Sequence, residues 1–157
     1  MIGENDKVSR RNGRVIAFQA LYSWDLSGVS LEELLNFSWL QKDDELHSDK
    51  PATEPSETAK EERTFASLLI AGTIEHIKEI DEDIKTHLSP SWSMERINKV
   101  TLAILRVSIY EMKFQNFSQA GIVIDEAVNI AKNYGPDDSF KFVNAVLDKI
   151  GKDEKSV

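Results

Sequence analysis

The run VTLAILRVSIYEM, residues 100–112, decides the fold class. Apolar side chains surround a helix drawn through it almost completely, which is typical of a helix buried on all sides. On either side of it, residues 70–88 and 120–134 repeat apolar side chains at helical spacing, as one buried helical face requires. No segment alternates apolar and polar residues between turn signals, as a half-buried strand would. The sequence therefore predicts an all-α fold.

Caps and breaks along the chain predict a compact bundle of about seven helices. Ser9 is the expected N-cap of the first helix, and Ser30 with Glu33 forms a capping box that begins the second. Asp137 or Asp138 is the expected cap of the last helix. The expected helices cover about residues 10–26, 31–37, 59–88, a short segment after Ser93, 100–112, 120–134 and a final stretch through Ile150.

The chain length of 157 residues is typical of one domain, and we expect a single domain over residues 1–157. Residues 42–58, KDDELHSDKPATEPSET, are polar and acidic and contain two prolines. This composition predicts a solvated loop, either ordered or disordered. Too little chain precedes the loop to form a core of its own, so we do not expect it to separate domains.

The formal net charge of −8 argues against indiscriminate binding to nucleic acid, because an acidic field repels a polyanion. The charge is unevenly distributed, since residues 25–63 carry eleven acidic against four basic residues. Basic residues cluster near the start of the chain, at Lys7, Arg10, Arg11 and Arg14. Any nucleic-acid site is therefore expected to be local.

Features that the sequence lacks indicate the cellular compartment in which the protein works. The sequence contains no cysteine, no secretory signal at its start and no apolar run as long as the roughly 18–20 residues of a membrane span. We therefore expect a cytoplasmic protein that does not enter a membrane.

The basic residues of the first expected helix share one sector of its surface with aromatic residues. At 100° per residue, the basic side chains fall on the same side as Phe18 and Tyr22, one or two turns further on. Cations that hold phosphates beside rings that stack on bases suit single-stranded RNA. A solvated helix end followed by core aromatics would show the same spacing. Asn12-Gly13 interrupts the helix formers here, so we expect the basic segment to be frayed in the absence of RNA.

Three stretches together resemble the NusB transcription antitermination family. They are RRNGRVIAFQALYSWDLS at 10–27, MERINKVTLAILRVSIYEMKF at 94–114 and VIDEAVNIAKNYGPDDSFKFVNAVLDKI at 123–150. The resemblance covers nearly the whole chain except residues 42–58. It implies a non-enzymatic adaptor, a monomer or a homodimer, that binds boxA-type single-stranded RNA of nascent rRNA transcripts with the ribosomal protein NusE in a transcription elongation complex. The alternative is a helical protein-interaction module that does not bind RNA.

The resemblance also implies site residues. The family's D-S-x-K-F run corresponds to residues 138–142, which adds a second RNA-contacting segment to the basic one. Phe142 is either a stacking platform or the margin of the core, and Asp138 is also a plain N-cap. The implied RNA-binding residues are Lys7, Arg10, Arg11, Arg14, Tyr22, Asp138, Ser139, Lys141 and Phe142. The implied NusE-binding residues are Glu75, Glu79, Glu82 and Asp83, which would equally form a solvated acidic helix face.

No pattern in the sequence indicates an active site. His47, His76 and His87 lack the spacing of metal ligands, and no phosphate-binding loop or nucleophile motif occurs. We therefore expect no enzymatic activity, no metal and no cofactor. Arg106 lies within the most apolar helix, where an unpaired charge would be expensive. We expect it to form a buried structural ion pair, with Glu111 or Glu126 as candidate partners.

Overall fold

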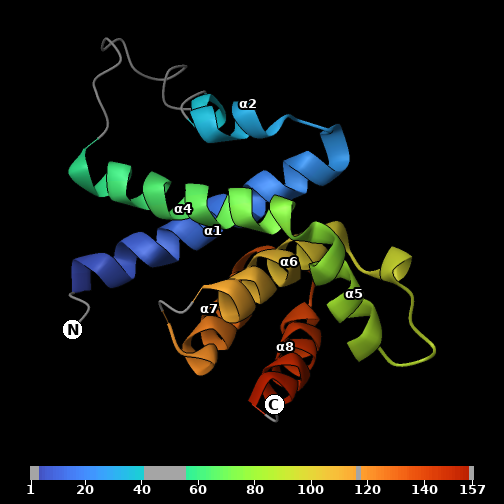
Figure 1. Cartoon of the computed structure of the whole chain (residues 1–157). Coiled ribbons are helices and arrows are strands. Elements are labelled where there is room, and N and C mark those ends of the chain that lie inside the picture. The colour runs from blue at the N-terminus through green and yellow to red at the C-terminus, as the bar shows by residue number, and fades with distance from the viewer. Residues whose placement is uncertain (1–3, 41–55, 116–117, 156–157) are drawn as a thin grey trace. The chain divides into compact units, whose positions relative to one another are not determined.

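The computed structural model describes residues 4–40, 56–115 and 118–155, and no strand occurs within these ranges (Figure 1). The chain divides into two compact units, Met1–Ala71 and Gly72–Val157. The all-α class and the approximate number of helices are confirmed. Among the helices of the described ranges, none is long and apolar enough to cross a membrane.

The first unit contains α1 (Glu4–Ser27), α2 (Leu31–Asn36) and most of α4 (Glu57–Glu75). The predicted N-cap at Ser9 is wrong, because α1 begins earlier. Ser9 is a buried residue inside α1, and its hydroxyl donates a hydrogen bond to Glu61 of α4 at 3.4 Å. The cap of α2 is confirmed, since the Ser30 hydroxyl accepts a hydrogen bond from the Glu33 backbone N–H at 3.2 Å.

Helices α1 and α4 run side by side in this unit (Figure 1), and the backbone of Gly13 lies close to α4. A Cβ atom at Gly13 would lie only 2.9 Å from Cδ1 of Phe65 and 3.0 Å from the carbonyl oxygen of Glu62. The Asn12 side chain donates a hydrogen bond to the Glu62 carboxylate at 2.8 Å. Asn12 and Gly13 therefore lie in a continuous helix, and the predicted fraying is not observed.

Most of the predicted loop at residues 42–58 lies outside the described residues, which resume at Ser56. Helix α4 begins at Glu57, two residues before the expected start. The Ser56 hydroxyl accepts a hydrogen bond from the backbone N–H of Ala59 at 3.1 Å, as an N-cap does. The last residues of the expected loop are thus helical.

The single long helix expected over residues 59–88 is wrong, because α4 ends at Glu75 and α5 covers Ile77–His87. His76 separates them with φ −103° and ψ 21°. Its ring stacks on Phe114, with 4.0 Å between ring centroids, and lies 6.0 Å from the ring of Tyr110. The apolar spacing continues through the break, so the sequence pattern did not reveal it.

The second unit is built around α6 (Lys99–Phe114), against which α5, α7 (Ala120–Tyr134) and α8 (Ser139–Lys155) pack. A short 3₁₀ turn, η1 (Met94–Arg96), precedes α6. The Asn98 side chain caps α6 by accepting hydrogen bonds from the backbone N–H groups of Val100 and Thr101. The prediction of a central buried helix is confirmed, because residues 101–111 are all buried.

Ion pairs join the helices of the second unit. Nε and Nη2 of the Arg106 guanidinium group each donate a hydrogen bond to one oxygen of the Asp81 carboxylate, both at 2.9 Å. The predicted buried ion pair of Arg106 is therefore present, with α5 supplying a partner that the sequence did not indicate. His87 of α5 also contacts the Asp153 carboxylate of α8. This contact pins the end of α5 to the end of α8.

Candidate nucleic-acid interface

The basic residues of α1 differ in exposure. Lys7 and Arg11 are exposed, and Arg10 is half-buried. Arg14 is only 5% exposed. The helix repeat placed these side chains in one sector, but it could not distinguish the exposed from the buried members. Lys7 and Arg11 are therefore the members of the cluster with the most surface for an RNA phosphate.

Two of the arginines of α1 lie over the ring of Phe65 of α4. The guanidinium carbons of Arg10 and Arg14 lie 5.7 Å and 5.5 Å from the centroid of the Phe65 ring. Cations at this distance from a ring face are attracted by its quadrupole, and the attraction is stronger where water is excluded. Arg14 thus contributes to the packing of α1 on α4. Tyr22, a further predicted RNA contact, is half-buried on the same helix.

The second predicted segment forms the start of α8. Asp138 has a φ of 65°, which short polar residues tolerate, and its carbonyl accepts a hydrogen bond from the Lys141 N–H at 3.1 Å. Its carboxylate lies 3.6 Å from Nζ of Lys141, and both side chains are largely exposed. The Ser139 hydroxyl oxygen is buried, beside Gly135. Of these three side chains, Asp138 and Lys141 are therefore accessible to a ligand, and Ser139 faces inward.

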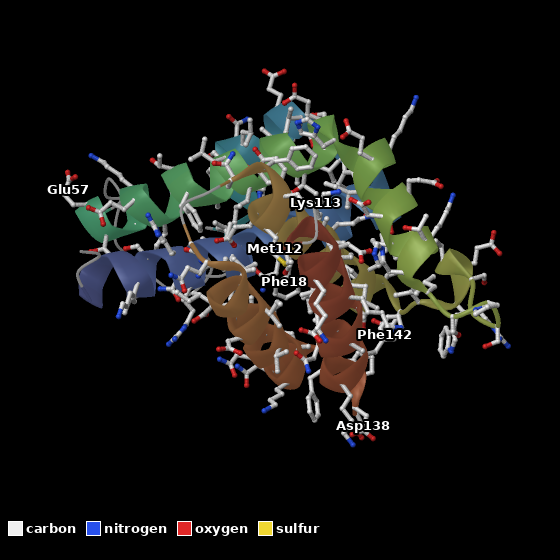
Figure 2. The ribbon with its side chains drawn as sticks, turned by 60° about the horizontal axis from the view of Figure 1, so that its bottom comes forward. Phe18, Glu57, Met112, Lys113, Asp138 and Phe142 are labelled. Carbon is white, nitrogen blue, oxygen red and sulfur yellow. The ribbon has the colours of Figure 1, made fainter. Side chains whose placement is uncertain are left out.

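Phe142 is half-buried and lies one turn into α8 from Asp138 (Figure 2). Its ring is 5.8 Å from the ring of Trp92, at an interplanar angle of 33°. Trp92 is 48% exposed. Sequence reasoning missed Trp92, although a tryptophan within the polar run Ser89–Ser93 is an unusual feature that would have indicated it.

The predicted partner surface is acidic and mostly exposed. Glu75, Glu79 and Glu82 are exposed at the end of α4 and along α5. Asp83 is half-buried and pairs with Lys113 of α6, which Figure 2 labels. Glu79 lies 3.4 Å from Nδ1 of His76. The three glutamates thus present negative charge outward, whereas Asp83 is engaged within the second unit.

The predicted RNA-binding residues form one group in each unit. Lys7, Arg10, Arg11 and Arg14 lie together on α1 in the first unit, and the residues at the start of α8 lie together in the second. In the first group Arg10 and Arg14 lie over the ring of Phe65. In the second, Nζ of Lys141 lies 5.9 Å from the centroid of the Phe140 ring. Neither group contains a nucleophile positioned by a base. Among the described residues, no cluster of three or more acidic or histidine side chains is arranged to hold a metal ion.

Comparison with known proteins gives the family. Residues 11–152 match the NusB family. The chain is 47% identical to the transcription antitermination protein NusB of Treponema denticola over 143 residues, which cover 91% of this chain and 96% of that protein. It is also similar to the crystal structure of antitermination factors NusB and NusE in complex with dsRNA, with a TM-score of 0.74, 29% identity and coverage of 93% and 98%. NusB of T. maritima gives a TM-score of 0.71 at 32% identity, with coverage of 91% and 90%. The chain therefore belongs to the NusB family.

Proposed function

We propose that this protein is a transcription antitermination factor that binds boxA-type single-stranded RNA of nascent rRNA transcripts together with the ribosomal protein NusE. It acts in the cytoplasm as an adaptor within the elongation complex, without enzymatic activity. The observation that carries the proposal is a local group of exposed cations in each unit, Lys7 and Arg11 on α1 and Lys141 on α8, on a chain whose net charge is −8. Family membership and the solved relative with NusE and RNA support it.

RNA binding rests on one group of exposed cations in each unit. Lys7 and Arg11 supply phosphate contacts from α1, and Lys141 supplies one at the start of α8. Few phosphate contacts give weak binding, because counterion release scales with their number. A partner that binds the same RNA raises the effective concentration of this chain's site near the RNA. The weak contacts of this chain and those of the partner then add to one overall affinity.

NusE binding rests on Glu75, Glu79 and Glu82. Exposed carboxylates steer a basic partner toward the surface and increase the association rate more than the affinity. Asp83 contributes indirectly in this proposal, because its carboxylate is paired with Lys113. An acidic surface for the protein partner and local cations for RNA keep the two ligands on different residues.

The proposal is tested by neutralising the accessible cations. The triple variant Lys7→Gln, Arg11→Gln, Lys141→Gln should bind a boxA-type oligonucleotide more weakly, with and without NusE, as measured by fluorescence anisotropy over a salt series. Each lost phosphate contact should reduce the slope of log K against log salt by about 0.7. Lys152→Gln is the matched control, since Lys152 is exposed at the far end of α8 and pairs with Asp148.

Two results would contradict the proposal in different ways. Unchanged affinity and salt slope in the triple variant would mean that the cations of α1 and α8 are not the RNA site. Failure of the parent protein to bind RNA even with NusE present would leave a helical protein-interaction module without RNA binding.

A further inference from the structure

Trp92 is an exposed aromatic residue that the proposed RNA site does not include. It lies between α5 and η1, in the polar segment that follows His87, and 48% of it is exposed. One neighbour of its ring is Phe142, at a centroid distance of 5.8 Å. The large aromatic residue is thus held in place on one side and open to solvent on another.

The surroundings of this pair favour an anionic, ring-bearing ligand. Two exposed cations lie near the pair along the chain: Lys141, whose Nζ is 5.9 Å from the centroid of the Phe140 ring, precedes Phe142, and Arg96 of η1 follows Trp92 by four residues. The Asp138 carboxylate offsets part of the Lys141 charge at 3.6 Å. Nucleotides combine a phosphate with a flat ring, and bases stack on aromatic side chains whatever their sequence.

We propose that Trp92 and Phe142 form a stacking platform for one unstacked base of single-stranded RNA. The inference rests on the proposed function and extends it, by adding Trp92 to the interface and by restricting the ligand to unpaired nucleotides at this place. Stacked bases of a nucleic-acid strand lie about 3.4 Å apart, so a ring inserted between two others needs about twice that separation. The base therefore stacks on the exposed side of Trp92, and Phe142 supports the tryptophan from behind.

The geometry explains why both rings are needed. A single exposed tryptophan on a polar segment would sample several rotamers and would lose that freedom when a base binds. Contact with Phe142, which is anchored in α8, restricts the ring before the ligand arrives. A preorganised platform costs less on binding.

Intrinsic tryptophan fluorescence tests the platform directly, with Trp92→Phe and Trp92→Leu as a matched pair. Phe keeps an aromatic face, and Leu keeps apolar bulk without one. Titration with a short single-stranded RNA should quench the fluorescence of the parent protein, and Trp92→Phe should lose that quenching while binding within about threefold of the parent. Trp92→Leu should bind about tenfold more weakly, as expected for loss of one base stack.

The controls separate this inference from the proposed function. Trp24→Phe removes a tryptophan of α1 and should leave both quenching and affinity unchanged. The same oligonucleotide annealed to its complement should not quench Trp92, because its bases are already stacked. If Trp92→Leu does not fold, as judged by circular dichroism, the quenching difference between the parent and Trp92→Phe decides the question.

Either of two results overturns the platform. The first is that RNA binding quenches the fluorescence of the parent and of Trp92→Phe equally, or quenches neither; the second is that folded Trp92→Leu binds RNA as tightly as the parent. Either result leaves the proposed function intact. If the parent binds NusE but no RNA under the same conditions, the proposed function fails, and the platform fails with it.

Discussion

At Gly13 the backbone of α1 approaches α4 so closely that a side chain would meet both a ring and a carbonyl oxygen. Glycine normally weakens a helix by about 1 kcal/mol relative to alanine. Here the missing Cβ permits the contacts between Asn12 and Glu62 and the packing of Arg10 and Arg14 on Phe65. Intrinsic helix propensity is thus outweighed by close packing at this position.

We predict that Gly13→Ala destabilises the protein by about 1–3 kcal/mol, because Phe65 must move to accommodate the methyl group. Urea unfolding followed by circular dichroism measures the change. Gly121→Ala is the matched control, since a Cβ there would have no heavy atom within 4 Å, and should be neutral or stabilising by up to about 1 kcal/mol. A stabilised Gly13→Ala variant would show that α1 and α4 do not pack as described.

The arginines of α1 illustrate what residue type alone leaves open. Arg10, Arg11 and Arg14 carry the same charge on the same helix, yet Arg11 is exposed and Arg14 is buried. Arg10 and Arg14 lie over the ring of Phe65, which is some fifty positions further along the chain. Trp92 shows the converse, because an aromatic residue that would usually be placed in the core is half exposed against Phe142.

Among the helices, α5 depends on contacts at both of its ends. At its start, the ring of His76 is stacked on Phe114. At its end, His87 contacts the carbonyl of Asp83 and the carboxylate of Asp153. Burial lowers the pKa of His87, but hydrogen bonds to Asp83 and Asp153 and the charges of these two residues raise it by more, so the net pKa lies above 6.5.

This shift makes the tie between α5 and α8 pH-dependent. The stabilisation that protonated His87 contributes is complete below the ordinary histidine pKa of about 6.5. It is lost as pH rises through the higher pKa of His87 in the folded protein. We predict that Asp153→Asn lowers the free energy of unfolding by less than about 1 kcal/mol under acidic conditions, because Asp153 is largely exposed. Above the folded pKa the variant and the parent should unfold alike.

Urea unfolding at a series of pH values measures this difference. Asp148→Asn, which removes an exposed pair with Lys152 on the same helix, should show no such dependence near neutral pH. A stability difference that grows with rising pH would contradict the assigned role of His87.

At the scale of the whole molecule, the two compact units share a helix. The division falls between residues 71 and 72, inside α4, which runs without interruption from Glu57 to Glu75. Unfolding one unit would fray the helix that completes the other. The single domain expected from the sequence therefore remains our proposal, in the sense of one cooperative folding unit.

We predict a single unfolding transition in urea, with coincident midpoints by far-ultraviolet circular dichroism and by tryptophan fluorescence. Leu21→Ala in the first unit and Leu147→Ala in the second should each move that one transition to lower urea. Each should lower the free energy of unfolding by about 2–5 kcal/mol, since both side chains are fully buried. Two separated transitions, with each substitution moving only one, would show that the units are independent domains.

By itself the sequence determined the helical class, the central position of residues 100–112, the extent of α7 and the cap of α2. These features depend on local spacing and on side chains a few residues apart, which a single chain displays directly. The family likewise follows from the ordered motifs at 10–27, 94–114 and 123–150.

Tertiary structure decided the rest. The break at His76, the need for glycine at position 13, the burial of Arg14, the pairing of Arg106 with Asp81 and the contact of Trp92 with Phe142 all join residues on different helices or segments. Helical periodicity gives the direction of a side chain around its own axis but not which ring, charge or backbone faces it. Packing supplies that partner, and the partner determines which charges and rings stay available to a ligand.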